Sequence, residues 1–371
     1  MTTAATALKK LTAARVALSK KMIERDDEID LALTALVAGE HLLLVGPPGT
    51  GKSMLCDAVS ELIHGTKFAY LMTKFTSPEE ILGPVSLSEL KADRYVRITA
   101  GKMPEAEVVF LDEIFKSSSA ILNTLLKILN ERVYDAGRGP VSCPLRLCVA
   151  ASNEWPTGEG QQDLGALFDR FVLRRTVRPI RTADGKKRLR FGPRDAGPLG
   201  VSLTREELDA AREAAAALPW SAEAVDAYEQ IHRELAKEGI VVGDRRDEKA
   251  VKIARAAAWL DGAAEVLPVH LGVLADCLWD SPEDHPAKAA AVVSRIANLT
   301  GARVNQLLTE AEEIIAGADV KNIVKVTEAA QKLTEVSRSL DKLKGNPRAE
   351  RANVYVKNEV QRLKRAAVEH I

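Results

Sequence analysis

The sequence is poor in cysteine and in aromatic residues, and each scarcity excludes a class of site. Of four cysteines, Cys56 and Cys277 are isolated, and Cys143 and Cys148 are separated by four residues with no second pair or nearby histidine. A structural zinc site needs four well-spaced ligands. We therefore expect structural thiols rather than a metal centre. No stretch interleaves aromatic with basic residues, as a platform for single-stranded nucleic acid would.

A net charge and long apolar runs are also missing. Fifty-two basic residues balance fifty-two acidic ones, so no global field would hold the chain on nucleic acid or an anionic membrane. The neutral total does not exclude a local basic patch. No apolar run reaches the roughly 18 residues of a membrane span, and lysines at positions 9, 10, 20 and 21 interrupt the first apolar patches. We expect a cytoplasmic protein without membrane insertion.

What the chain does have is a stretch typical of phosphate binding. The segment GPPGTGKS, residues 46–53, fits the spacing GxxxxGK[ST], in which backbone N–H groups and a following helix hold phosphates. A predicted buried strand, His41–Val45, precedes it, and a predicted helix, Ser53–Ile63, follows. In this pattern the lysine contacts the β- and γ-phosphates and the serine contacts Mg²⁺. The candidate nucleotide-binding residues are Pro48, Gly49, Thr50, Gly51, Lys52, Ser53 and Met54.

A second apolar run, Val108–Leu111, ends in Asp112 and Glu113. Carboxylates at the carboxyl end of a parallel strand lie where such sheets bind ligands. Asp112 would then hold Mg²⁺ beside Ser53, and Glu113 would polarise the attacking water. The alternative is a strand end with two solvated acids, which the phosphate loop upstream disfavours.

Two further polar residues follow predicted strands or precede them. Asn153, after the run LRLCVAAS, could reach the same water, or could simply form a turn ahead of Pro156. Arg170, in the segment DRF, could supply positive charge to a neighbouring subunit's site, or could be a salt-bridged surface arginine.

The order of these segments resembles the AAA+ ATPases, and more narrowly the MoxR family and its RavA-like branch. The resemblance covers about residues 20–285. It is carried by ERDDEIDLALTALVAGEHLLLVGPPGTGKS, TKFTSPEEILGPVSL, VVFLDEIFKSSSAILNTLLKILNER, LRLCVAASNEWP and VVGDRRDEKAVKIARAAAWLDGAAEVLPVHLGVLADCLWD.

The resemblance implies a role for each candidate residue, with ATP and Mg²⁺ as cofactors. Lys52 and Ser53 would complete the Walker A loop, Asp112 and Glu113 the Walker B pair, and Asn153 would be sensor 1. Ser53 and Asp112 would be the Mg²⁺ ligands.

The resemblance also implies that subunits complete one another's sites, because family members form hexameric rings. Arg170 would be the arginine finger, acting on ATP bound by the adjacent subunit, with Arg174 and Arg175 as weaker candidates. Arg245, at the start of a predicted lid helix, would be sensor 2, and Arg246 is the alternative.

The predicted fold is α/β: an AAA+ P-loop domain of three layers, αβα, with a parallel five-stranded sheet, then an all-α lid and a helical C-terminal extension. We expect strands at about 41–45, 67–72, 107–111, 145–151 and 171–177. We expect three parts: residues 1–195, the ATPase core with an N-terminal helix; residues 196–285, the lid; and residues 286–371, a helical hairpin or stalk.

Two insertions in the core match the family's pattern. Residues 76–107, with a β-like RYVRIT, resemble its helix 2 insert, and a hairpin around Asp135–Pro140 resembles its presensor hairpin. Both would face the ring pore or a partner, unless they are only loops.

Three later segments complete the expected organisation. Residues 181–200 are rich in Gly, Pro and basic residues and suggest a linker rather than a core element. A capping pattern at Thr204 predicts the first lid helix. Beyond Pro286, near-heptad spacing predicts two or three antiparallel helices with the break GNP at residues 345–347.

The function implied by the resemblance is ATP-driven, chaperone-like remodelling of a client, with a von Willebrand factor A domain protein as partner and a homohexamer as the assembly. The alternative is a nucleic-acid motor or loader on the same core, which the neutral charge disfavours. A nucleotide-switched scaffold with little hydrolysis is disfavoured by the presence of Glu113 and Asn153.

Overall fold

The computed structural model describes residues 2–136, 139–155, 167, 170–193, 197–297, 307–308, 310–311, 313–315, 323–341 and 347–369. The chain divides into two compact units, Met1–Ala290 and Ala291–Ile371. Within the described residues, no helix is both long enough and apolar enough to cross a membrane.

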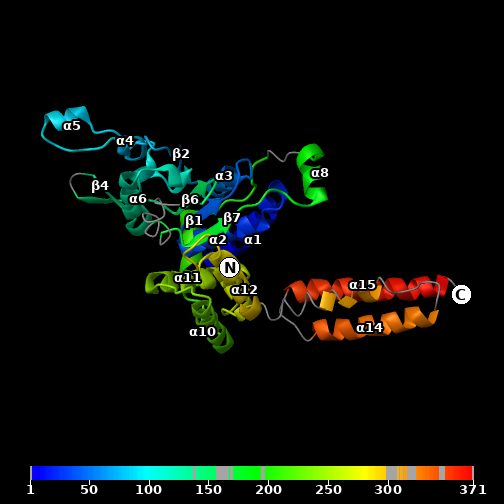
Figure 1. The fold of residues 1–371 in the computed structure, drawn as a ribbon. Helices are drawn as coiled ribbons and strands as arrows, with labels where there is room; N and C mark the ends of the chain where they lie inside the picture. Colours follow the sequence, from blue (N-terminus) through cyan, green and yellow to red (C-terminus); the bar gives the residue numbers. More distant parts are fainter. Residues whose placement is uncertain are drawn as a thin grey trace. The chain divides into compact units, whose positions relative to one another are not determined.

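The first unit is built on a parallel sheet, as predicted (Figure 1). Its strands lie in the order β2-β3-β6-β1-β7 and are β1 (Leu42–Val45), β2 (Lys67–Leu71), β3 (Val108–Asp112), β6 (Leu147–Ser152) and β7 (Leu173–Thr176). Leu42 pairs with both Val149 and Leu173, so the strands begin at one common edge and end at the other. We call these the amino edge and the carboxyl edge.

Helices bury both faces of the sheet, which is why its central strands are continuous apolar runs. Leu43 and Val45 point to the face covered by α6 (Ser119–Glu131), and they share one core cluster with Val109 and Leu125. The other face is covered by α2 (Asp26–Ala38) and α3 (Lys52–Leu62), and α1 (Thr3–Lys21) packs on α2. The predicted three-layer αβα fold is therefore confirmed.

The predicted insertion projects away from the sheet (Figure 1). It contains α4 (Pro78–Leu82), α5 (Leu87–Lys91) and the 3₁₀ turn η1 (Met103–Glu105). The β-like segment RYVRIT forms only an isolated antiparallel bridge between Val85 and Arg97. The hairpin β4 (Val133–Asp135) and β5 (Pro140–Ser142) is antiparallel and lies on the same side of the domain as α5 (Figure 1).

The stretch expected to be a linker contains a helix, α8 (Ala183–Phe191). Two local contacts explain why it forms. Thr182 caps the helix by accepting a hydrogen bond from the N–H of Gly185 at 2.9 Å, and the Glu24 carboxylate accepts one from the N–H of Arg181 at 2.8 Å. Leu189 and Phe191 are exposed, so α8 is not a core element.

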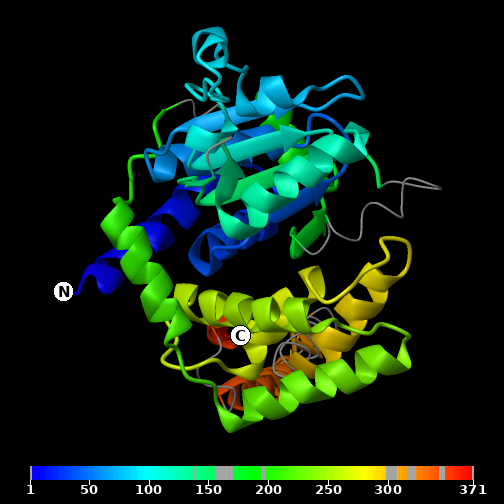
Figure 2. The ribbon, with the colours of Figure 1, turned by 90° about the vertical axis from the view of Figure 1, so that its left-hand side faces the viewer.

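The lid follows as helices α9 (Arg205–Ala216), α10 (Ala222–Lys237) and α11 (Asp244–Leu260) and a 3₁₀ segment, η4 (Pro268–Asp276). Thr204 and Glu207 form the predicted capping box of α9. Figure 2 shows the yellow-green lid helices gathered below the sheet. The helix α12 (His285–Ala297) spans the boundary between the two units.

The second unit contains a two-helix pair, α14 (Ile323–Asp341) and α15 (Pro347–Glu369). Its apolar seam includes Leu333 and Val356, and two buried polar side chains, Ser337 and Asn353, interrupt this seam. Ser337 Oγ donates to Asn353 Oδ1 at 2.6 Å, and Asn353 Nδ2 donates to Asp341 Oδ1 at 2.5 Å. Such a polar layer fixes the register of two helices.

Replacing Asn353 with alanine should therefore destabilise this helix pair by about 1–3 kcal/mol, because Ser337 and Asp341 lose a buried partner. Urea unfolding followed by circular dichroism measures the change. Asn358→Ala, at an exposed position of the same helix, is the matched control and should have almost no effect. Equal effects of the two variants would contradict a role for the polar layer.

Candidate functional site

The candidate phosphate loop lies at the carboxyl edge, between β1 and α3. The N–H of Gly46 donates to the carbonyl of Ser152 at 3.0 Å, and the N–H of Val177 donates to the carbonyl of Val45 at 2.7 Å. A Cβ atom on Gly46 would overlap the carbonyl oxygen of Val177. Only glycine lets the loop leave the sheet at this point.

The loop backbone is suited to an anionic ligand. Gly49 and Gly51 have φ angles of 77° and 88°, in the left-handed region that favours glycine. No described residue accepts a hydrogen bond from the N–H of Gly49, Thr50 or Gly51. The space where a Cβ of Gly49 would lie is open, and Pro48, Ser53 and Met54 are exposed around it. Open amides ahead of a helix N-terminus are the donors that phosphates require.

Lys52 is folded over the loop. Its Nζ donates to the carbonyl oxygens of Gly46 at 2.5 Å and of Pro47 at 3.1 Å. Burial lowers the pKa of Lys52, and the negative charges of Asp112 and Glu113 act in the opposite direction. The ammonium group therefore lies within the field of the two acids, and phosphate oxygens could replace its carbonyl partners.

Arg25, which the sequence interpretation missed, holds the loop from behind. This buried residue precedes α2, and its Nε donates to the carbonyl of Thr50 at 2.8 Å. The hydroxyl of Thr50 in turn donates to the carbonyl of Pro47 at 2.9 Å. In the sequence, only its place in the segment that carries the family resemblance could have indicated Arg25. A contact between residues 25 positions apart leaves no local pattern.

The predicted acids and Asn153 come together at the same edge. Glu113 has a φ of 54°, an uncommon backbone conformation for glutamate, and its side chain is buried. Asn153 Nδ2 donates to Glu113 Oε1, and Lys116 Nζ lies 3.5 Å from the same oxygen. The amide and the ammonium thus hold the carboxylate in place, as the positioning of a water molecule would require.

Asp112 and Ser53 fit a Mg²⁺ site in chemistry. Asp112 ends β3 and is half-buried, and one of its oxygens accepts a hydrogen bond from the N–H of Glu113 at 3.0 Å. Ser53 is exposed in the first turn of α3. A carboxylate and a hydroxyl are hard oxygen donors, which Mg²⁺ prefers.

The candidate finger Arg170 lies at the opposite edge. Its N–H donates to the carbonyl of Leu167 at 3.0 Å, and it is followed by Phe171, whose ring centroid is 6.0 Å from that of His41. His41 directly precedes β1, so both residues belong to the amino edge. Arg170 is half-buried there, away from the phosphate loop of its own chain.

The two weaker candidates make contacts within the chain. Arg174 is fully buried, its Nη2 donates to the carbonyls of Cys277 and Trp279, and its guanidinium lies 4.3 Å from the Trp279 ring centroid. Arg175 pairs with Asp27 and with Asp276, the latter at 2.8 Å. Neither side chain extends freely into solvent, so neither could act on a neighbour in this conformation.

The two sensor 2 candidates lie in different environments. Arg245 is exposed and lines a cavity of about 260 Å³ with Gly39, Glu40 and Arg132, at the amino edge. Lys249, one turn later in α11, forms an ion pair of 2.9 Å with Glu40. Arg246 is buried and paired with Asp280. The structure therefore does not bring Arg245 together with the phosphate loop of the same chain.

Aromatic contacts connect the carboxyl edge to the lid. Trp155, two residues after Asn153, packs edge-on against Trp279 at 5.5 Å between ring centroids, and Phe115 lies 6.2 Å from Trp155. Phe115, two residues after Glu113, and Trp155 thus connect the candidate site to the segment around Trp279 that Arg174 holds.

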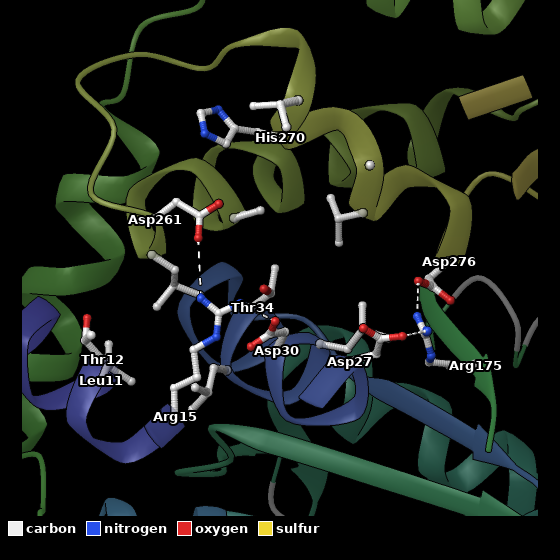
Figure 3. A pocket seen from close by; sticks show the side chains of 17 residues that line it. Leu11, Thr12, Arg15, Asp27, Asp30, Thr34, Arg175, Asp261, His270 and Asp276 are labelled. Atoms are coloured by element: carbon white, nitrogen blue, oxygen red, sulfur yellow. Dashed lines mark hydrogen bonds and ion pairs between the residues drawn. The ribbon is translucent and has the colours of Figure 1, made fainter. Parts of the chain in front are cut away.

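A cavity of about 240 Å³ separates α1 and α2 from the lid (Figure 3). Two ion pairs reach across to the lid, Arg15 with Asp261 and Arg175 with Asp276, and the same two arginines also pair with Asp30 and Asp27 of α2 (Figure 3). Its charged residues are paired with one another, so we interpret it as a contact that holds the lid rather than as a ligand site.

This contact should depend on pH through Asp276. Burial raises the pKa of Asp276 to about 6, Arg175 opposes the shift, and Asp27 and Glu28 add to it. Because this pKa is above its unfolded value, the folded state binds the proton of Asp276 more tightly than the unfolded chain does. This protonation stabilises the fold at low pH, and the stabilisation is lost as pH rises through about 6. The loss should be about 2–3 kcal/mol between about pH 4 and 7.

Urea unfolding of wild type and of Asp276→Asn over this pH range tests the prediction. The difference between their free energies of unfolding should change by that amount, since asparagine does not titrate. Asp226→Asn, an exposed position of α10, serves as the control. A difference that stays constant with pH would exclude Asp276 as the titrating group.

Comparison with known proteins agrees with this geometry. Residues 9–196 match the family described as the MoxR domain in the MoxR-vWA-beta-propeller ternary systems, and residues 223–291 match an AAA lid domain. An uncharacterized protein of Methanocaldococcus jannaschii is 36% identical over 337 residues, which are 90% of this chain and 85% of that one. The protein MoxR of Paracoccus denitrificans is 25% identical over 76% of this chain and 92% of its own length.

A solved structure shows the same fold. It is that of a proposed ATPase from Cytophaga hutchinsonii, with a TM-score of 0.64 at 14% sequence identity, over 79% of this chain and 96% of the other. Membership of an AAA+ family implies ATP hydrolysis. The phosphate loop at the carboxyl edge, the lid and the matched family together show that this chain belongs to the MoxR family of AAA+ ATPases.

Proposed function

We propose that this chain is a Mg²⁺-dependent ATPase of the RavA-like branch that works as a homohexameric ring and remodels a client protein. In this proposal Lys52 and the loop amides bind the phosphates, and Ser53 and Asp112 hold Mg²⁺. Glu113 polarises the attacking water, and Asn153 positions Glu113. The proposed location is the cytoplasm, and the proposed parts are core, lid and C-terminal helices with the predicted boundaries.

One observation carries the ring: the phosphate loop and the candidate cations lie at opposite edges of the sheet. Arg170 and Arg245 are both at the amino edge, whereas the loop, Asp112 and Glu113 are at the carboxyl edge. A single chain therefore presents the phosphate loop and the two acids at one edge and the two candidate arginines at the other. A head-to-tail contact between copies would bring the two together and would close into a ring.

This arrangement changes how Arg245 would act. As sensor 2 of its own lid it would have to travel from the amino edge to the carboxyl edge. We propose instead that Arg245, like Arg170, contacts the nucleotide of the next subunit. Lid movement would then be transmitted between subunits.

The proposed partner is a protein with a von Willebrand factor A domain. The support is the description of the matched family, which names MoxR and vWA components together in ternary systems. The insert and hairpin on one side of the domain offer exposed apolar side chains for a client or partner, including Leu87, Leu90 and Val141.

A mixing experiment tests the ring. ATPase rate is measured against protein concentration for wild type, Arg170→Ala, Lys52→Ala and an equimolar mixture of the two variants. Each variant alone should be inactive, and the wild-type rate per subunit should rise with concentration. Random mixing should restore about one quarter of the wild-type rate, because a working site needs an intact loop next to an intact finger.

A concentration-independent rate that survives Arg170→Ala would mean that the monomer is competent, and the ring would be rejected. Inactive variants whose mixture stays inactive would place Arg170 in its own subunit's site.

A further inference from the structure

Helix α1 carries an open groove with apolar residues in the middle and lysines at its ends. Its lining includes Ala13, Val16 and Ala17 from α1, and Leu199 from the segment after α8. Lys9 and Lys20 flank it, and no acidic residue is among those that line it in the described part of the chain. Val16, in the middle of α1, is 52% exposed.

Among the described residues, the lysines around this groove have no ion-pair partner of opposite sign. Neither Lys9 nor Lys20 forms an ion pair with a described residue, and Lys21 Nζ donates only to the carbonyl of Gly197. The basic helix α8 is adjacent, since Arg188 Nη2 lies 3.4 Å from the carbonyl of Lys20. Because the whole chain has a formal net charge of zero, the positive charge of this surface is balanced by acidic residues elsewhere in the sequence.

The shape of the groove favours a helix as its occupant. From Lys9 to Lys20 the floor is about 17 Å long, enough for three turns of a second helix. Alanines at positions 13 and 17 would let another backbone approach closely. A membrane or a nucleic acid fits less well, because the floor is recessed and carries no aromatic side chain.

An acidic helix face of the required kind is present in the lid of the same protein. The exposed residues of the first half of α10 include Glu223, Val225, Asp226 and Glu229, and Val225 is 46% exposed. None of these three acids forms an ion pair with a described residue. The face thus offers a central apolar side chain between carboxylates, opposite in charge to the groove.

The groove and the acidic face also lie on the two surfaces that the proposed ring contact would bring together. The C-terminal end of α1 adjoins the phosphate loop, since Met22 follows α1 and its side chain lies beside Gly51. The helix α10 adjoins the start of α11, where Arg245 lies, because Tyr228 Oη donates to the carbonyl of Asp247 at 3.3 Å. A neighbour that places Arg245 near this chain's loop would bring its α10 toward this chain's α1.

We propose that the groove on α1 of one subunit binds the acidic face of α10 of the next subunit. The inference rests on the proposed ring and names one of its contacts. Such a contact is heterologous, because two different surfaces of the same chain meet, and it can repeat around a closed ring.

Charge reversal tests the contact on the full-length chain. Lys9→Glu/Lys20→Glu reverses the groove, and Asp226→Lys/Glu229→Lys reverses the acidic face. Sedimentation velocity with Mg²⁺ and a non-hydrolysable ATP analogue measures the concentration of half-assembly. Each variant alone should require about tenfold more protein, since attractive charges become repulsive. Their equimolar mixture should recover assembly close to wild type, because each contact between unlike subunits is again complementary.

Matched controls separate this contact from general electrostatics and from misfolding. Lys186→Glu/Lys187→Glu makes the same change of charge on α8, outside the groove lining, and should assemble as wild type does. Circular dichroism establishes that every variant is folded. Lys9→Gln/Lys20→Gln should give an effect between those of wild type and the reversed groove.

The outcomes distinguish the contact from the ring itself. Reversed variants that assemble like wild type, while the Arg170 and Lys52 variants still complement each other, would overturn this contact and leave the ring. Loss of assembly in both variants without recovery in their mixture would mean that the two surfaces bind something other than each other. A wild type that stays monomeric at every concentration would overturn both proposals.

Discussion

Replacing Glu113 with glutamine is expected to lower ATP turnover by about a hundred- to ten-thousandfold and to leave ATP binding unchanged. The substitution preserves the size of the side chain and its contact with Asn153, but it removes the negative charge that would polarise water. Because the loop amides and Lys52 remain in place, the phosphates keep their donors. Steady-state turnover and the affinity for a fluorescent ATP analogue measure the two effects separately.

The matched control is Glu154→Gln, an exposed glutamate that directly follows Asn153. It makes the same chemical change close to the site and should leave turnover unchanged. Asn153→Ala should also lower turnover without weakening binding, because Glu113 would lose the amide that orients it. Turnover that survives Glu113→Gln would remove this residue from the proposed role and would favour a nucleotide switch over a motor.

The local part of the site could be predicted from sequence because its residues are close along the chain. The spacing of Gly46, Lys52 and Ser53 fixes a loop, and an apolar run before Asp112 fixes a strand end. Strand periodicity and the family resemblance then placed these segments on one parallel sheet. The structure places them together at the carboxyl edge.

The remaining features depend on contacts between distant segments, which no local pattern records. Arg25 reaches Thr50, and Arg174 reaches residues more than 100 positions later. The position of Arg245 at the amino edge depends on how the lid packs. The sequence therefore indicates that Arg245 lies at the start of a helix, but not at which edge of the sheet it lies. The helix α8 was missed because Gly185 and its basic neighbours suggest a loop, whereas the contact of Glu24 with Arg181 stabilises its start.

Loss of the Arg174 side chain is expected to destabilise the first unit by about 3–5 kcal/mol in the variant Arg174→Ala. The side chain is fully buried, so its removal leaves a cavity beside Trp279. It also removes the guanidinium donor from the carbonyl of Cys277 and leaves the carbonyl of Trp279 with only the longer hydrogen bond from Arg246 Nη1, at 3.4 Å. Thermal unfolding should shift down by roughly 10 °C.

Two variants separate the buried contact from charge alone. Arg175→Ala removes an arginine one position away, but its ion pairs are partly exposed, and the cost should be about 1 kcal/mol. Arg174→Lys keeps the charge but loses the planar group that stacks on Trp279, so its effect should be intermediate. Equal losses of stability in Arg174→Ala and Arg175→Ala would show that the buried contact stabilises the fold no more than the partly exposed ion pairs do.

The variant Arg174→Ala should also uncouple the lid from the candidate site. Trp279 packs on Trp155, which follows Asn153, and Arg174 holds the backbone around Trp279. In Arg174→Ala, amide hydrogen exchange should therefore quicken at residues 277–280 before it does in β1 or β3. Tryptophan fluorescence should also respond less to ATP than in wild type, since the two indoles would no longer keep a fixed contact. Unchanged exchange and an unchanged fluorescence response in a folded Arg174→Ala would mean that the lid is held by the Arg15 and Arg175 ion pairs instead, and that the aromatic contact carries no signal from the site.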